Sequence, residues 1–396
     1  MTHVIAPSVW LIFLVLSLPQ LSETMYSPSL PTIARDLNVS PSTAENTLTI
    51  YLIGFALGIL FWGILSDRYG RKLSLLASFS ICILGCLSCY FSTSITRLMI
   101  SLFIQSFGGA GGTVLGQALC RDAFNENMLG KVYSTVASAQ AIFLANGPVA
   151  SSMIMERWGW PAIFLFLIVY ALGLSGASAA WLSETHPPEN RGRISVLEVA
   201  RRLLTDSRAV GYLLIVGMCL GIYFSYFAEG PFYLIKLLGL STKGYGYSFT
   251  AMSVATLLGG IVSKKLHDHY GSLHIMKLGL MVIAVASSLF VAVTLLHSFV
   301  MPLSASVLIG CTLLSQMGIM GGNCIVINNA LALALVDYKW CVGTASSLFG
   351  FFYYCVVAGC AFGMATLHNG TLLPMPLYFL SLALLMQGIQ RTLLFR

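Results

Sequence analysis

The stretch that decides the fold is GILSDRYGRK at residues 63–72, which closes a long apolar run. Gly63 allows two helices to approach closely, and Gly70 permits a tight turn. Asp67 falls at the end of the expected helix, where it can pair with Arg71 or with the positive end of a neighbouring helix dipole. Such contacts would hold two faces of a protein together in one conformation and break in another.

A plain basic loop beside a membrane span would also contain the three cations of this stretch, but it would not require the glycines or the aspartate. The pattern recurs 201 residues later, where LHDHYG at 266–271 matches LSDRYG at 65–70 in Leu, Asp, Tyr and Gly. We therefore predict a conformational-switch motif, repeated in part, that consists of Gly63, Asp67, Arg68, Gly70, Arg71, Lys72 and Asp268.

Composition identifies the solvent of this chain. Hydrophobic residues make up 57% of the 396 residues and charged residues only 9%, and the mean hydropathy is +0.84. A soluble domain carries about 25% charged residues, so hydrocarbon must be the main solvent, and there only helices or closed barrels satisfy their backbone groups. Long unbroken apolar runs favour helices over a barrel. The sequence thus predicts an all-α polytopic membrane protein.

Apolar stretches near 20 residues predict about twelve spans. The first six lie at 8–28, 46–65, 73–92, 98–120, 132–154 and 161–183, and the second six at 210–233, 245–263, 274–297, 300–325, 343–366 and 373–394. The repeated motif then predicts two six-helix bundles, at 1–183 and 210–396, joined by a linker at 184–209. Tandem bundles of this kind are typical of transporters that rock around a site near the membrane midplane.

The distribution of basic residues orients the chain. Of its 21 Lys and Arg residues, 16 fall in one set of loops and 5 in the other. The positive-inside rule therefore predicts that both termini and the linker are cytoplasmic. The net charge of +7 reflects this asymmetry, so we expect membrane lipid as a partner and no nucleic acid. The N-terminus does not resemble a secretory signal, because no basic residue precedes its apolar run.

The linker carries five arginines and a possible short helix. Ser195 and Glu198 have the spacing of a capping box, and three apolar positions would share one face: Val196, Val199 and Leu203. One interpretation is an amphipathic helix on the inner membrane surface with its arginines toward lipid phosphates. A plain linker is the other.

Two of the 14 acids, Glu23 and Glu229, fall within spans, and these spans are equivalent in the repeat. An intramembrane acid is a functional hypothesis by default, and burial disfavours the charged form of a carboxylate. We expect Glu23 to take a proton from outside and substrate binding to favour its release inside. Glu229 would have the same role or contact the substrate. Alternatively, either acid lies near the outer mouth and is solvated.

Further candidates for proton coupling or substrate contact are Tyr26, Gln105, Gln117, Asn146 and Asn323. Hydrogen bonding between helices is the commoner role of such amides, and the aromatics could line a cavity or simply pack. Cys86 and Cys89 have C-x-x-C spacing without an accompanying His or acid, which favours packing over a redox or metal site. The sequence contains no ATP-binding loop or catalytic constellation, so we expect no enzyme activity and no cofactor, with an ion gradient as the energy source.

GILSDRYGRK closely resembles the G-x-L-S-D-R-x-G-R-K signature of the major facilitator superfamily, in its usual place between spans two and three. Four further stretches are similar to the Bcr/CflA drug-resistance branch of the drug:proton antiporters: MYSPSLPTIARDLNVS (25–40), IQSFGGAGG (104–112), CRDAF (120–124) and GTASSLFGF (343–351). The resemblance implies a major facilitator fold in a bacterial inner membrane and proton-coupled export of small amphipathic compounds.

The sequence departs from this branch at three places. Thr24 stands where the branch usually places an Asp, and the acid is the adjacent Glu23, rotated by about 100° on a helix. Leu102 stands where the branch carries a buried Arg, three residues before Gln105. The glycine-rich motif of the fifth span survives only at 146–148. These departures concern the standard coupling scheme and leave the fold unaffected.

The sequence thus predicts a monomeric secondary active transporter, most simply a proton-coupled exporter of drugs or other small amphipathic molecules. A dedicated exporter or importer of a single metabolite is the alternative, and the loss of the Arg at Leu102 favours it. A non-transporting membrane sensor is an alternative of another class, although the chain has no sizeable soluble domain to support it.

Overall fold

The computed structural model describes residues 8–124, 143, 146–185 and 195–394. Within these residues, eleven helices are long and apolar enough to cross a membrane. The predicted fifth span lies mostly outside the described residues, and its described end, 146–158, is helical. The prediction of an all-α polytopic membrane protein is confirmed.

The N-terminal helices follow the predicted spans and extend several of them. They are α1 (Val9–Met25), the 3-10 turn Ser27–Ser29, α2 (Leu30–Asp36), α3 (Pro41–Tyr69), α4 (Arg71–Tyr90), α5 (Ile95–Ala123) and α7 (Pro161–Trp181). The start of α3 is well defined, because the Ser40 side chain accepts a hydrogen bond from the Thr43 N–H and Pro41 occupies the first helical position. This helix therefore begins five residues before the predicted span.

The C-terminal helices follow the predicted spans. They are α8 (Val196–Thr205), α9 (Ser207–Pro231) with a π-helical turn (Phe232–Leu237), α10 (Thr242–Leu266), α11 (Ser272–Leu295) with a second π-helical turn (Leu296–Val300), α12 (Ala305–Ala334), the 3-10 segment Val336–Cys341, α13 (Val342–Leu367), α14 (Pro374–Ile389) and the final turn Gln390–Leu394. Of these, α10, α12 and α13 are longer than predicted. The predicted start of the tenth span at 300 is wrong. Met301 is extended, and Ser304 caps α12.

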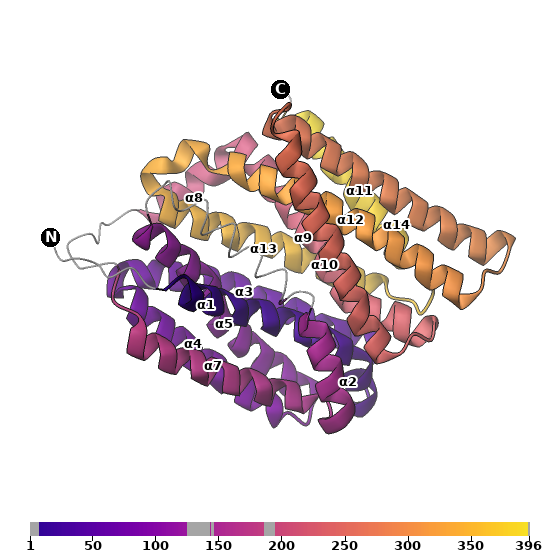
Figure 1. Ribbon diagram of the computed structural model, residues 1–396, viewed down its shortest axis with the longest axis horizontal. Coiled ribbons are helices and arrows are strands. Elements are labelled where there is room, and N and C mark those ends of the chain that lie inside the picture. The colour runs from indigo at the N-terminus through magenta and orange to yellow at the C-terminus, as the bar shows by residue number, and fades with distance from the viewer. Residues whose placement is uncertain (1–7, 125–142, 144–145, 186–194, 395–396) are drawn as a thin grey trace.

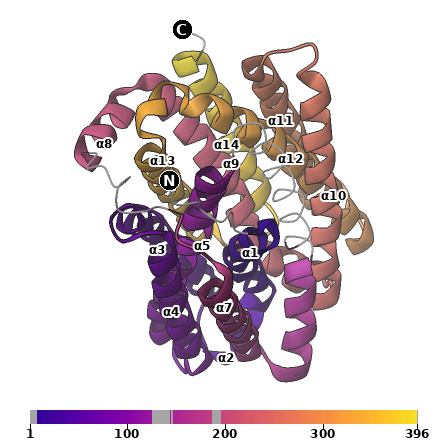
Figure 2. The ribbon, with the colours of Figure 1, turned by 60° about the vertical axis from the view of Figure 1, so that its left-hand side comes forward.

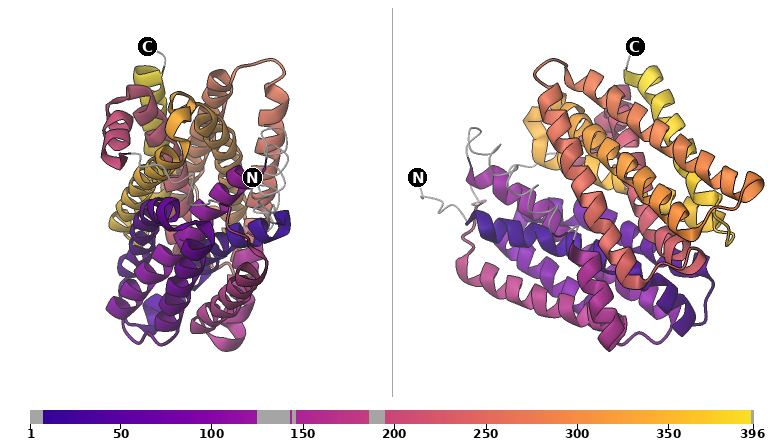
Figure 3. Two further views of the ribbon diagram at one scale, coloured as in Figure 1. Left: turned by 90° about the vertical axis from the view of Figure 1, so that its left-hand side faces the viewer. Right: turned by 45° about the vertical axis from the view of Figure 1, so that its right-hand side comes forward.

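Figure 1 shows helices α1–α7 as one group of the ribbon and α9–α14 as another. We call these groups the N half and the C half. α3 and α13 pack against each other at their junction, as the turned views in Figures 2 and 3 also show. We call the end of the molecule that holds residues 63–72 the motif side, and the opposite end, where α3 and α10 begin and α13 ends, the far side.

The N half is held together by very close helix contacts at glycines. A Cβ atom on Gly108 of α5 would overlap the backbone N of Cys82 and would lie 2.7 Å from the backbone O of Ser78, both on α4. A Cβ on Gly54 of α3 would lie 2.6 Å from the Phe103 carbonyl oxygen. The glycine-rich stretch of α5 therefore serves close packing, as in other membrane helices.

The linker contains the predicted short helix, and one face of this helix packs on the protein. The Ser195 side chain accepts a hydrogen bond from the Glu198 N–H at 3.4 Å, which confirms the cap of α8. Val199 and Leu203 are fully buried, but α8 packs against α9 and α13. Its inner face therefore contacts protein instead of lipid, and the Arg202 guanidinium lies 5.6 Å from the centre of the Tyr338 ring.

Candidate functional site: buried acids between the two halves

The motif at 63–72 forms a network of ion pairs on the motif side. Nη1 of Arg71 donates to Oδ1 of Asp67 at 2.6 Å, which confirms the predicted pair, and its Nε donates to Oδ2 of Asp122 on α5 at 2.9 Å. Gly70 has a φ of +99°, which only glycine adopts readily, and this conformation lets α4 begin directly after α3. The motif thus joins α3, α4 and α5.

Glu184, just after α7, completes this network and was missed by the sequence analysis. Its two carboxylate oxygens accept the backbone N–H groups of Arg71 and Lys72 at 2.8 and 3.2 Å. A carboxylate at the positive end of a helix is favourable, and Glu184, not the predicted Asp67, occupies that place at the start of α4. These ion pairs lie within the N half, and Arg68 is exposed.

The motif meets the C half at one glycine. A Cβ on Gly63 would overlap the Ser347 side chain of α13. Nearby, Nη1 of Arg121 donates to Oγ of Ser346 at 3.2 Å. Asp268, the counterpart of Asp67 in the repeat, is exposed and forms no ion pair with a described residue, so the C half does not reproduce the network within the part of the chain that the structure describes.

Glu23 faces the C half from α1. It is 7% exposed, and its Oε1 accepts a hydrogen bond from the Tyr354 hydroxyl on α13 at 3.5 Å. The adjacent Thr24 faces elsewhere. Its side chain donates to the Gln20 carbonyl at 2.9 Å and closely contacts Gly147 at the end of the fifth span. The shift of the acid by one position therefore directs it at the other half.

Tyrosines from three helices surround Glu23. Tyr51 of α3, Tyr223 of α9, and Tyr353 and Tyr354 of α13 all interact electrostatically with its carboxylate. The Tyr223 hydroxyl is buried and has no hydrogen-bond partner among the described residues. Of these phenol groups, Tyr354 hydrogen-bonds the acid, and each combines an apolar ring with a polar hydroxyl.

Three of the other predicted site residues contact groups other than Glu23. Tyr26 bonds a threonine hydroxyl of α3 at 2.8 Å, Asn323 donates to a carbonyl of α9 at 3.0 Å, and Gln105 accepts from a thiol of α4 at 3.9 Å. Each of these contacts ties two helices within one half, which is the commoner role of such groups. The side chains of Gln117 and Asn146 are exposed.

Glu229 belongs to a second acid cluster, which also contains Glu45 and His368. Nδ1 of His368, directly after α13, lies 2.8 Å from Oε2 of Glu229 on α9 and 3.1 Å from Oε1 of Glu45 on α3. Glu229 is 2% exposed and Glu45 is fully buried. We call these three residues the far-side cluster.

One imidazole nitrogen cannot serve both acids of this cluster. Nδ1 carries a single hydrogen and lies closer to Glu229 than to Glu45, whose oxygens have no hydrogen-bond partner among the described residues. Contacts with Glu229 and then with Glu45 raise the pKa of His368 to about 10. His368 is therefore a cation near neutral pH and faces two carboxyl groups.

The far-side cluster also has the donor types of a cation site, since the three groups lie within 4.8 Å of one another. However, its spacings of 2.8 and 3.1 Å are those of hydrogen bonds and ion pairs between the groups themselves. The contacts within the cluster are thus direct ion pairs between its side chains.

Sequence analysis missed Glu45 and His368 because both lie beside apolar runs and outside them. The helical start at Ser40 and Pro41 was the available signal for Glu45, since a cap followed by proline begins a helix there. It would have placed Glu45 in the second turn of α3. No comparable signal marks His368, whose partners come from distant parts of the chain.

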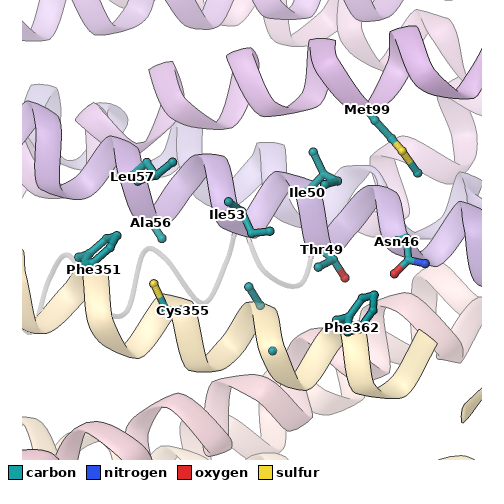
Figure 4. Close-up of a pocket in the computed structure, with 12 residues that line it drawn as sticks. Asn46, Thr49, Ile50, Ile53, Ala56, Leu57, Met99, Phe351, Cys355 and Phe362 are labelled. Atoms are coloured by element: carbon teal, nitrogen blue, oxygen red, sulfur yellow. The ribbon is translucent and has the colours of Figure 1, made fainter. Parts of the chain in front are cut away.

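A groove of about 610 Å³ lies between α3 and α13. Figure 4 shows side chains of the two helices on either side of it, with Met99 of α5 at one end. Its lining is almost entirely apolar, with Asn46 and Thr49 as polar exceptions, and Ile53 and Phe362 are exposed on the outer surface. The groove therefore opens toward the lipid, and its volume is that of a site for a drug-sized molecule.

Comparison with known proteins identifies the family. The Major Facilitator Superfamily profile matches residues 12–386. The chain belongs to the major facilitator superfamily. An uncharacterized transporter of Rickettsia felis is 31% identical and covers 92% of this chain and 90% of its own length. The bicyclomycin resistance protein homolog of Haemophilus influenzae is 28% identical, over 90% of this chain and 88% of its own.

Multidrug resistance protein D of Escherichia coli is 27% identical over 66% of each chain. These relatives confirm the resemblance to Bcr/CflA-type drug transporters. Among solved structures, a D-xylose–proton symporter superimposes with a TM-score of 0.74 at 14% identity over 96% of each chain, which confirms the major facilitator fold. The chain is therefore a multi-pass membrane transporter, and its family is one of transporters and not of enzymes.

Proposed function

We propose that this major facilitator exports small amphipathic compounds, drugs included, in exchange for protons. It would act as a monomer in the bacterial inner membrane, with both termini in the cytoplasm and with no cofactor. The observation that carries this proposal is Glu23, a buried acid of the N half that faces tyrosines of the C half. Relatives of the chain that are named for drug resistance support drugs as the class of substrate.

The chemistry of Glu23 suits an exchange of protons for substrate. An isolated buried carboxylate is costly when charged and stable when protonated. A cationic or hydrogen-bonding substrate beside it would stabilise the charged form and so favour loss of the proton. A proton arriving from outside would have the reverse effect and favour loss of the substrate.

The surroundings of Glu23 suit the apolar part of such a substrate. The phenol groups of Tyr51, Tyr223 and Tyr354 lie near enough to the acid to interact with its charge, and Tyr354 hydrogen-bonds it. The groove between α3 and α13 offers an apolar surface on the lipid side, from which an amphipathic compound could be drawn. An acid, several phenols and an apolar groove together fit a molecule with one polar end.

A transporter of one metabolite is the second candidate. Leu102 is buried at 1% exposure in α5, at the position where drug:proton antiporters of this branch carry an Arg. Without that cation, Glu23 lacks one partner that would hold it charged. The solved relative in this fold that transports D-xylose with protons is consistent with a single-solute role.

Transport in inverted membrane vesicles tests the proposal. An imposed pH gradient should drive uptake of compounds from a panel of cationic, neutral and anionic dyes, and Glu23→Gln should lower the initial rate at least about tenfold, a loss typical of a coupling acid. Asp36→Asn is the matched control, because Asp36 is an exposed acid of the same half. Equal rates in wild type and Glu23→Gln would remove Glu23 from the mechanism, and uptake of a single compound would favour the second candidate.

A further inference from the structure

The two halves are in contact on the far side. Oγ of Ser27 donates to the carbonyl of Phe227 at 2.6 Å, and Oγ of Ser42 donates to the carbonyl of Ala365 at 2.6 Å. An ion pair of 2.6 Å joins Lys243 of α10 to an acid at the end of the fifth span. The far-side cluster lies within this contact, because Glu45 comes from the N half and its two partners come from the C half.

The charges of the cluster do not balance when both acids are ionised. Two carboxylates and one imidazolium leave a net charge of −1 in a site where both acids are almost fully buried. An unbalanced buried charge is strongly unfavourable. One proton on Glu45 makes the cluster neutral.

Opening of the far side would instead favour the charged form of Glu45. The halves would part between Glu45 and the pair of Glu229 and His368, since no covalent element joins them there. Water would then solvate Glu45, and a solvated glutamate is charged at neutral pH. Glu229 and His368 would stay together as a balanced ion pair within the C half.

We propose that Glu45, Glu229 and His368 form a proton-operated latch, in which Glu45 must bind a proton from the far side before that side can close. This inference rests on the proposed function, because it takes the N half and the C half to alternate between a state open on the motif side and a state open on the far side. It adds Glu45 and His368 as coupling residues beside Glu23. The Tyr233 phenol also interacts with the cluster, through Glu229.

The latch is tested without any transported compound. Spin labels on p-acetylphenylalanine at Thr93 and Tyr247, both exposed on the far side of opposite halves, report the distance between the halves by double electron–electron resonance. This chemistry leaves the ten native cysteines untouched. The full chain in lipid nanodiscs, with EDTA to remove stray divalent cations, is measured between pH 5.5 and 8.5.

In the wild-type protein, low pH should favour the state that is closed on the far side. A single linked proton changes the logarithm of the closed-to-open ratio by up to about one per pH unit. Glu45→Gln should be closed throughout with a slope near zero, because the amide is neutral at every pH. Glu229→Gln should behave in the same way, because His368 then balances Glu45. His368→Gln should close only at lower pH, because two acids must then be neutralised.

Asp36→Asn is the control and should keep the wild-type slope, because Asp36 is an exposed acid of the same half and lies outside the cluster. Size-exclusion profiles confirm that each variant is folded. A wild-type slope in Glu45→Gln, or an equal loss of slope in Asp36→Asn, would overturn the latch. The proposed export is tested separately by the vesicle assay, so failure of transport and failure of the latch are distinct results.

Discussion

At the scale of single residues, a displacement of one position in α1 decides which half the acid faces. Thr24 points at Gly147 in the N half, and Glu23 points at Tyr354 in the C half. The about 100° between adjacent helical residues accounts for the difference. An acid at position 23 therefore contacts the C half when the two halves come together, whereas an acid at position 24 would face the N half.

The charge of His368 gives a prediction at this scale. Its protonated form is stabilised by contacts with Glu229 and then with Glu45, so its contribution to stability should be complete below about pH 6.5 and decline as the pH rises toward about 10. The difference in Tm between wild type and His368→Gln should therefore shrink between pH 6.5 and 10. Thermal unfolding followed by size-exclusion chromatography measures it. The control His269→Gln, at an exposed turn, should show no such trend, and a constant gap for His368→Gln would refute the assignment.

At the scale of elements, helix contacts in this protein depend on specific glycines. Gly108 and Gly109 are neighbours in α5, but only Gly108 meets the α4 backbone. A Cβ on Gly109 would lie 3.8 Å from the Cys82 sulfur, which is ordinary contact. The stretch from 108 to 112 thus contains glycines with different roles, although they look alike in the sequence.

The two glycines make a matched pair for mutation. Gly108→Ala should destabilise the protein by about 1–3 kcal/mol, because α4 and α5 must move apart. Gly109→Ala should be neutral or slightly stabilising, since alanine favours helix by about 1 kcal/mol. The Tm values of the two purified variants provide the comparison. A similar loss in both, or no loss in Gly108→Ala, would show that the contact is not tight.

At the scale of the whole molecule, the repeat places LSDRYG and LHDHYG at the ends of equivalent helices, α3 and α10. Only the first of these loops carries an ion-pair network among the described residues. The duplication therefore extends to the fold but not to the chemistry of the motif. The acids are similarly unequal, because Glu23 is surrounded by tyrosines and Glu229 is paired with His368.

Orientation in the membrane can be checked at this scale. Alkaline phosphatase, which is active only outside the cytoplasm, should be inactive when fused after residue 206 and active when fused after residue 240. The reason is the excess of Lys and Arg on the motif side. The reverse pattern would place the termini outside. Equal activity at both sites would contradict the path of α9 across the membrane.

Sequence was sufficient for the properties that follow from local composition. Apolar runs predicted the helices, and the motif predicted the Asp67–Arg71 pair and the family. Burial of Glu23 and Glu229 was predicted for the same reason, since an acid inside an apolar run must lie at depth. These properties depend on neighbours within a few residues along the chain.

Only the tertiary structure decided which of these groups meet. Glu45 and His368 are 323 positions apart, and their contact arises because the start of α3 lies against the end of α13. Glu184 reaches the N-terminus of α4 for the same kind of reason. Packing of distant helices brings charges together at distances that no local pattern records, so the composition of the two acid sites became apparent only in the folded chain.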